Sequence, residues 1–299
     1  MPKRILLVGA LSTDLELSTP LAFHAHMAAN FGDEFTLVTA FLDRIVYTLS
    51  QDSFEAHDAV TGVSLRDFDC VYMRGPKLQK LGTQAFYLSR FCAINGIACI
   101  NDYSLFYSGT KVAQTIVFQE EQAPFLKTLY AINKTDLVRR AAQTLGFPYI
   151  LKTNVGSHGD SNYLVRTQEA ADAILADEPD TDFLAQAYCP NDRDYRLLIM
   201  GKKHLIFERR GTDGSHLNNT SKGGEATRTD EALPPAIVKK AYDISKRLNL
   251  MVSGVDVMPH LETGEFYFLE INSQPQLYSG ALLPEKMEYL RGFLHELVD

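Results

Sequence analysis

Apolar runs and helical stretches alternate along the first third of the chain. Four short runs have the length of buried strands: residues 4–10, 34–40, 69–73 and 96–100. Helical stretches lie between them, at 18–31 and 83–95. This alternation predicts crossover units and a mostly parallel, doubly wound sheet over residues 1 to about 105. The turn after the first run has a single glycine and lacks the GxGxxG of a dinucleotide site, which argues against such a site there.

The pattern changes at about residue 106. A helix at 111–122 precedes a second one, for which Thr135 has the character of an N-cap and Gly146 of a stop. Short strands and one further helix follow: strands 148–153, 161–166 and 182–188, helix 168–177. Longer strands come last, with two helices: strands 195–201, 203–210, 250–258 and 265–272, helices 231–248 and 284–299. We therefore expect an α/β domain at 1–105, a small α+β unit at 106–187 and a mixed-sheet unit at 188–299.

The last two strands predict a hairpin with polar groups on one face. The loop ETG at 262–264 ends in glycine, as favoured three-residue hairpin loops do. With Leu261 opposite Glu265, Asp256 falls opposite Glu270, on the face that also carries Asn272. Two carboxylates and an amide oxygen suit a hard cation such as Mg²⁺. Hydrated acids at the rim of a sheet are the alternative, and a register shift of one residue would turn Asp256 to the other face.

A glycine-rich segment, KTNVGSHGDSN at 152–162, follows another strand. Small residues let backbone N–H groups approach phosphate oxygens, and Lys152 supplies a positive charge. The segment is not a Walker A loop, because GxxxxGK[ST] is missing, and an ordinary turn is the alternative reading. Lys111 heads the preceding helix, where a solvated surface lysine would be equally ordinary.

Composition limits the kind of protein this is. The 299 residues carry a formal charge of −8, which disfavours nucleic acid as the main partner. The four cysteines are scattered without CxxC spacing, so neither a zinc site nor a disulfide framework is indicated, and a reducing cytoplasm fits best. The apolar run after the N-terminal basic residues is short, which favours a first strand over a signal peptide. No stretch has the roughly 20 apolar residues of a membrane helix.

Two segments, GVDVM…FYFLEINSQP and ERRGTDGSHLNNTSKGG, together with the lysines and the glycine-rich loop, resemble the ATP-grasp superfamily. Within it the chain is similar to the RimK-like ligases and glutathione synthetase, over about residues 70 to 280. The resemblance implies ATP bound between two α+β units, with Mg²⁺, or else Mn²⁺. The implied ATP-binding residues are Lys111, Lys152, Gly156, Ser157, His158, Gly159, Gln186, Ala187, Tyr188 and Asp194. Implied metal ligands are Asp256, Glu270 and Asn272, in agreement with the hairpin register.

The resemblance also implies a reaction in which a carboxylate takes the γ-phosphate of ATP to form an acyl phosphate, which an amine then captures to form an amide. Cations near the transferred group lower such a barrier most, and Arg209 and Arg210 are the catalytic candidates. The implied substrate-binding residues are Arg74, Asn219, Lys222 and Gly223. A peptide or small acid plus an amine would be the substrates, and a homo-oligomer is compatible with the family. A nucleotide-binding regulatory protein without turnover and a kinase of the same fold are the alternatives.

This sequence departs from the family pattern at three places. Ala187 stands where the family usually has glutamate, which puts side-chain contacts to adenine there in doubt. Leu217 replaces an arginine of glutathione synthetase, which puts recognition of a small substrate carboxylate in doubt. NSQPQ replaces NSSPG after the metal strand, so that Gln274 and Gln276 become candidates for shaping the acceptor side.

Overall fold

The N-terminal part of the protein is built around a parallel sheet. The computed structural model describes residues 2–12, 18–74, 78–105, 109–156, 162–210, 225–229 and 232–298. The sheet has the order β2-β1-β5-β6 and is parallel throughout. Its elements are β1 (Lys3–Gly9), α1 (Ser18–Phe31), β2 (Phe35–Phe41), β5 (Cys70–Met73), α2 (Leu78–Asn95) and β6 (Ala98–Ile100). Ile5 packs with α1 and Leu6 with α2, so the two helices cover opposite faces and the doubly wound prediction is confirmed.

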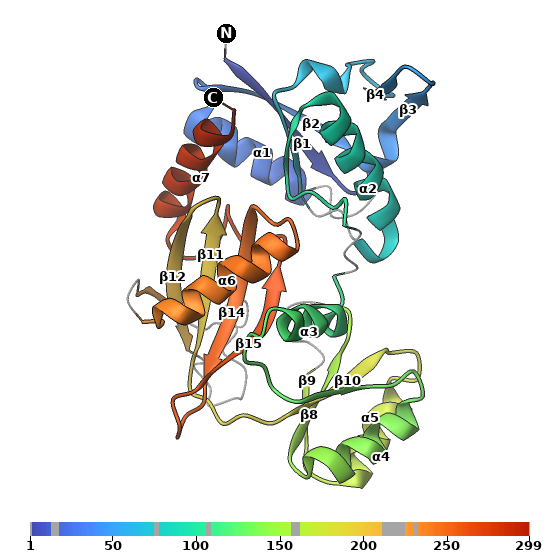
Figure 1. The fold of residues 1–299 in the computed structure, drawn as a ribbon, viewed down its shortest axis with the longest axis vertical. Helices are drawn as coiled ribbons and strands as arrows, with labels where there is room; N and C mark the ends of the chain where they lie inside the picture. Colours follow the sequence, from blue (N-terminus) through green and yellow to red (C-terminus); the bar gives the residue numbers. More distant parts are fainter. Residues whose placement is uncertain are drawn as a thin grey trace.

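A two-stranded hairpin between β2 and β5 was missed by the sequence patterning. It consists of β3 (Ile45–Leu49) and β4 (Phe54–Asp58), flanked by short 3₁₀ helices at Leu42–Arg44 and Leu65–Asp67. The hairpin projects from the parallel sheet beside α2 (Figure 1). Phe54 is anchored edge-on against Phe91 of α2, with ring centroids 5.5 Å apart.

The central unit is a small antiparallel sheet covered by two helices. Its strands, in the order β7-β10-β8-β9, are β7 (Thr128–Tyr130), β8 (Tyr149–Thr153), β9 (Asn162–Val165) and β10 (Phe183–Ala187). The helices are α4 (Lys134–Leu145) and α5 (Gln168–Asp177), which enclose a separate apolar core with the sheet. The side chain of Asn133, not the predicted Thr135, caps α4 by accepting from the N–H of Asp136. Gly146 follows the helix at φ 71°, as its predicted stop requires.

The C-terminal unit is a five-stranded sheet in the order β13-β12-β11-β14-β15. Its elements are β11 (Asp194–Met200), β12 (Lys203–Arg210), β13 (Glu225–Arg228), α6 (Pro235–Arg247), β14 (Val252–Pro259), β15 (Phe266–Asn272) and α7 (Leu283–Val298). The pairings among these five strands are antiparallel, and a single parallel bridge joins Phe125 to Phe268 of β15, so the sheet predicted to be mixed is mainly antiparallel. Helix α3 (Lys111–Glu120) packs on β15 through Phe118 and Phe268, whose ring centroids lie 5.9 Å apart.

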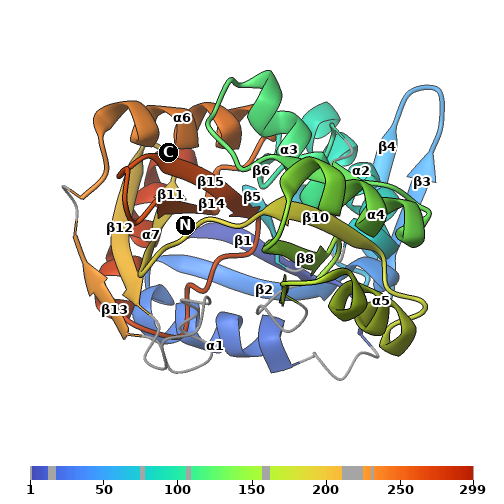
Figure 2. The ribbon, with the colours of Figure 1, turned by 90° about the horizontal axis from the view of Figure 1, so that it is seen from below.

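The C-terminal helix joins the two larger units. Leu290 and Leu294 of α7 are fully buried in a core shared by α1, the parallel sheet and the C-terminal sheet. Figure 1 shows α7 beside α1, and Figure 2 shows the central unit beside the C-terminal sheet. Among the described residues, no helix has the length and apolar character needed to cross a membrane.

Candidate active site

The β14–β15 hairpin places Asp256 opposite Glu270, although its turn differs from the prediction. His260, not Leu261, pairs with Glu265, so the loop is one residue longer than the predicted three-residue loop. An irregularity in β15 then restores the register: Val257 pairs with Phe268 and Asp256 with Glu270, which leaves Leu269 as an extra residue. The loop prediction was wrong, but the pairing it predicted for Asp256 is confirmed.

The same irregularity separates apolar from polar side chains along β15. Without it, Phe268 and Glu270 would share a face, because side chains alternate along a strand. With it, Phe268 and Ile271 both enter the core beneath α3 and α6, while Glu270 and Asn272 turn to the opposite face. The N–H of Ile271 donates to Oε1 of Gln114 on α3, at 2.8 Å, which ties the strand to that helix.

One row of side chains crosses the sheet at this level. Phe207 on β12 pairs with Arg196 on β11, Arg196 with Asp256 on β14, and Asp256 with Glu270 on β15. Directly paired residues project from the same face of a sheet. The row therefore presents an aromatic ring, a cation and two carboxylates on one surface, in that order.

Two arginines hold the Asp256 carboxylate. Arg196 donates from Nε and from one terminal nitrogen to the two carboxylate oxygens, each at 2.6 Å, and Arg209 adds a contact of 3.2 Å. Burial alone would raise the pKa of Asp256, but the two guanidinium groups outweigh it and hold the pKa below its ordinary value. Asp256 is therefore ionised in the folded protein.

Arg209 bridges Asp256 to a third carboxylate. Its Nε donates to Asp194 at 2.5 Å, and the Arg209 side chain is 5% exposed. Burial raises the pKa of Asp194 to about 6, although Arg209 acts in the opposite direction. Asp194, predicted to bind ATP, thus lies within the same charge cluster as Asp256, a predicted metal ligand.

Glu270 and Asn272 supply the other two predicted metal ligands. Burial raises the pKa of Glu270 above its ordinary value, and the charges of Lys111 and Lys152 limit the rise. Asn272 is on the adjoining row, paired with Gly254, and its Nδ2 is a buried amide without a hydrogen-bond partner among the described residues. Two carboxylates and an amide on one face fit a hard divalent cation, whose other ligands are typically water or phosphate.

The described side chains form no closed metal cage. Among the described residues, no group of three or more His, Cys, Asp or Glu side chains could hold a metal ion. An open set of two carboxylates and an amide is the arrangement expected where substrate phosphates complete the shell.

Two lysines from the neighbouring unit face Glu270. Lys152 on β8 donates to Oε1 of Gln186 at 2.9 Å, and the Gln186 amide donates in turn to Thr128. Burial lowers the pKa of Lys152 to about 8, and the nearby charge of Lys111 adds to the effect. The Lys111 ammonium donates to the carbonyl of Gly156 at 2.8 Å, so both predicted lysines lie at the start of the glycine-rich segment.

The segment predicted to contact adenine is at the end of β10. Gln186 and Ala187 are its last two residues, and Tyr188 follows directly. The N–H of Ala187 donates to the carbonyl of Lys127, at 2.9 Å. Ala187 contributes no polar side chain, so contacts at this point come from Gln186 and from the backbone.

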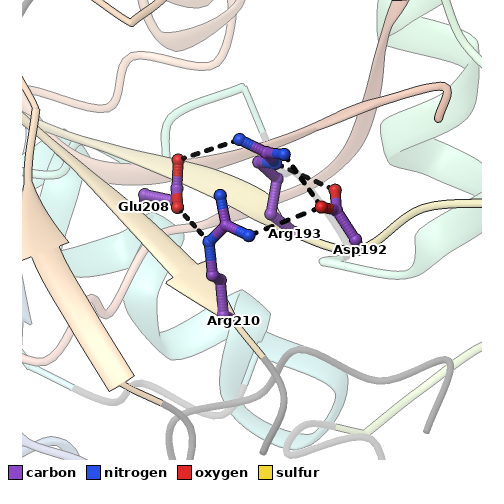
Figure 3. A network of polar contacts seen from close by, with 4 residues as sticks. All are labelled: Asp192, Arg193, Glu208 and Arg210. Atoms are coloured by element: carbon purple, nitrogen blue, oxygen red, sulfur yellow. Dashed lines mark hydrogen bonds and ion pairs between the residues drawn. The ribbon is translucent and has the colours of Figure 1, made fainter. Parts of the chain in front are cut away.

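Arg210, predicted as catalytic together with Arg209, is not brought to the cluster. It points to the other face of β12, where its side chain is 48% exposed. There it donates to Glu208 and pairs with Asp192 at 3.4 Å. Arg193 closes this surface network through Asp192 and Glu208 (Figure 3).

Arg74 reaches the site from the N-terminal unit. It follows β5, is 7% exposed and donates from both terminal nitrogens to the carbonyl of Pro275, each at 3.3 Å. Its guanidinium lies over the ring of Phe23, 4.6 Å from the centroid. Gln274 fixes the same segment by donating to the carbonyl of Met73 at 3.1 Å. The predicted Ser157, His158, Gly159, Asn219, Lys222 and Gly223 lie outside the described residues.

Arg196 was not among the residues to which the sequence reasoning gave a role. Its position two residues after Asp194 on a strand puts both side chains on one face, and this spacing was the available signal. Its partner Asp256 is 60 residues away, so the contact depends on the β11–β14 register.

A sheet that carries oxygen donors, faced by Lys152 of the smaller sheet and by Lys111 of helix α3, is the arrangement of an ATP-grasp ligase, an enzyme class that forms amide bonds. Residues 111–281 match the RimK-like ATP-grasp domain. The chain belongs to the RimK-like ATP-grasp family. No curated protein matches the chain.

Solved structures share the fold along almost the whole chain. The macrocyclase MdnC of Microcystis aeruginosa MRC, bound with the precursor peptide MdnA, is 16% identical with a TM-score of 0.67, over 97% of this chain and 99% of that one. The ATP-grasp ligase PsnB, complexed with a phosphomimetic variant of its minimal precursor, Mg and ADP, is 13% identical with a TM-score of 0.66, over 96% and 98%. D-alanyl-alanine synthetase A of Vibrio cholerae is 16% identical with a TM-score of 0.68, over 100% and 99%.

Proposed function

We propose that this protein is an ATP- and Mg²⁺-dependent ligase that joins a carboxylate to an amine through an acyl phosphate, releasing ADP and phosphate. The observation that carries the proposal is the convergence of Asp256, Glu270 and Asn272 on one face, opposite Lys111 and Lys152. These groups are the donors and cations that a metal-bound triphosphate requires. A peptide substrate is supported by the precursor peptides bound to MdnC and PsnB.

In the proposed reaction each residue acts through position and charge. Lys152 and Lys111 hold phosphate oxygens, and Gln186 keeps the Lys152 ammonium in place. Asp256, Glu270 and Asn272 would hold Mg²⁺, which neutralises phosphate charge and draws electrons from the phosphorus. Phosphoryl transfer is driven mainly by such positioning and electrostatic stabilisation.

Arg209 is the residue placed to meet charge that develops during the reaction. Asp194 and Asp256 fix its guanidinium from two sides, so little reorganisation is needed when a phosphoryl or tetrahedral oxygen becomes more negative. A metal ion held by Asp256 would share this carboxylate with Arg196 and Arg209.

A screen of carboxylates and amines, peptides included, tests the proposal. ADP release is followed for each pair and the products are weighed by mass spectrometry. A ligase releases ADP only when acid and amine are both present and gains the mass of an amide. ADP formation with a phosphorylated acid and no dependence on amine would make the protein a kinase, and ATP binding without turnover would make it a regulatory binder.

A further inference from the structure

Lys286, in the first turn of α7, is a buried lysine that forms no ion pair with any described residue. The residue is 3% exposed, and its ammonium donates to the carbonyl of Ser279 at 3.0 Å. Among the described residues, no carboxylate lies within ion-pair distance of it. An ammonium has three N–H donors, and a buried charge without a partner is unfavourable. The described contacts therefore leave part of the bonding capacity of Lys286 unused.

The surroundings of Lys286 place it on the same face as the metal ligands. Its Nζ lies 5.7 Å from the centroid of the Phe207 ring, which is the β12 end of the row that continues through Arg196 and Asp256 to Glu270. Neighbouring strands are about 4.8 Å apart, so Phe207 is roughly 10 Å from Asp256 and roughly 14 Å from Glu270. Lys286 is thus on the far side of the metal ligands from Lys111 and Lys152.

A second polar group borders the ammonium. Gly280 carries no side chain; a Cβ built there would stand 3.9 Å from Nζ of Lys286 and 3.5 Å from Oε1 of Gln276. The ammonium of Lys286 and the amide of Gln276 therefore lie on two sides of the space beside Gly280. Gln276 is exposed to solvent. The ammonium donates as it stands, and a half-turn of the Gln276 amide, which exchanges Oε1 for the NH₂ group, lets both side chains donate to a single carboxylate.

We propose that Lys286 and Gln276 bind a carboxylate of the acid substrate other than the one that is activated. This inference rests on the proposed ligase function and narrows it to substrates with at least two carboxylates, such as acidic peptides. The two arginines on this face are already engaged: Asp256 holds Arg196, and Asp194 holds Arg209. Neither can bind a substrate carboxylate without giving up its partner.

A carboxylate fits the position better than a nucleotide phosphate. The lysines that would hold the phosphates, Lys111 and Lys152, act on Glu270 at the β15 end of the row, whereas Lys286 is at the β12 end. Burial and the charge of Arg196 lower the pKa of Lys286 to about 8, and binding of an anion there raises it again. The pKa of Lys286 is accordingly a direct measure of anion binding.

NMR of the full chain labelled with ¹³C and ¹⁵N at lysine side chains tests the inference without turnover. The Lys286 resonance is assigned with Lys286→Arg and titrated with the peptide acetyl-Glu-Glu-amide, with its neutral analogue acetyl-Gln-Gln-amide and with inorganic phosphate. We expect the acidic peptide alone to shift Lys286 saturably and to raise its pKa, while Lys239, an exposed lysine of α6, stays unmoved. Gln276→Ala should weaken the response about tenfold, and Lys203→Met, an exposed site on β12, should leave it unchanged.

Each result decides the matter. No response of Lys286 to the acidic peptide, or an equal response to the neutral one, overturns the site. A response to phosphate as strong as that to the peptide overturns the assignment to a carboxylate. Binding at Lys286 in a protein that never releases ADP removes the ligase proposal but keeps the anion site, whereas turnover with a silent Lys286 removes the site alone.

Discussion

Arg196 and Asp256 form a two-pronged ion pair across the β11–β14 ladder, with both oxygens of the carboxylate at 2.6 Å from guanidinium nitrogens. The two side chains are 16% and 9% exposed, so the pair is largely withdrawn from water. Asp256 is also a proposed metal ligand. In this proposal the same carboxylate would serve both the stability of the sheet and the binding of the cation.

Arg196→Gln should lower the free energy of unfolding by about 3 kcal/mol, because it leaves part of the charge of a buried carboxylate uncompensated. The pKa of Asp256 is depressed in the folded state, so its contribution to stability is present above its unfolded pKa of about 3.9 and is lost as the pH falls through the folded value. Urea unfolding at several pH values should show a smaller acid loss in Arg196→Gln than in wild type. Arg139→Gln, which removes an exposed pair with Asp136, serves as control and should change stability by less than about 0.5 kcal/mol.

Gly254→Ala should disturb the site through a single methyl group. A Cβ at this position would lie 3.2 Å from Cβ of Pro275 and 3.5 Å from Cδ of Arg196, so the segment held by Arg74 must shift. We expect a loss of about 1 to 3 kcal/mol in unfolding and a raised KM for the acid substrate. Gly292→Ala, in the interior of α7, is the matched control and should stabilise by up to about 1 kcal/mol.

ATP affinity should fall as the pH rises through about 8. The pKa of Lys152 is lowered to about 8 by burial, so the lysine loses its proton above that pH in the free protein. Phosphate favours the protonated form, and binding near pH 8 should therefore take up a proton. Calorimetry of ADP binding in two buffers with different ionisation enthalpies measures this uptake. An unchanged uptake in Lys152→Met would contradict the assignment.

Arg209 and Arg210 should differ sharply despite being neighbours. Arg209→Lys keeps the charge but loses the fixed fork between Asp194 and Asp256, and we expect kcat to fall about 100-fold. Arg210→Lys should change kcat by less than about threefold, because that side chain is held on the other face by Glu208 and Asp192. An equal fall of kcat in the two variants would contradict the assignment of the catalytic role to Arg209 alone.

The sequence was informative where local rules decide the structure. Strand periodicity located β14 and β15 and paired Asp256 with Glu270, but the turn loop was predicted one residue too short. The pairing survived only because Leu269 is an extra residue in β15. This irregularity allows both Phe268 and Ile271 to pack in the core. Rules for turn sequences do not take such packing into account.

Contacts between distant segments could not be predicted in the same way. The Arg196–Asp256 pair and the approach of Arg74 to Pro275 join residues 60 and 201 positions apart. Each requires the relative placement of whole elements. No sequence motif marks Lys286, because the surroundings of its side chain depend on how α7 packs against β12.

Glu270→Gln tests the central claim, that Asp256, Glu270 and Asn272 hold the divalent cation beside the nucleotide. The substitution keeps the shape, and the raised pKa of Glu270 means that loss of its buried charge should not cost stability. Bound Mn²⁺ is counted by electron paramagnetic resonance with a non-hydrolysable ATP analogue present, and Glu265→Gln at the hairpin turn is the control. The account predicts that Glu270→Gln weakens Mn²⁺ binding at least about tenfold and stops ADP release, while Glu265→Gln matches wild type. Wild-type Mn²⁺ affinity in Glu270→Gln would contradict it.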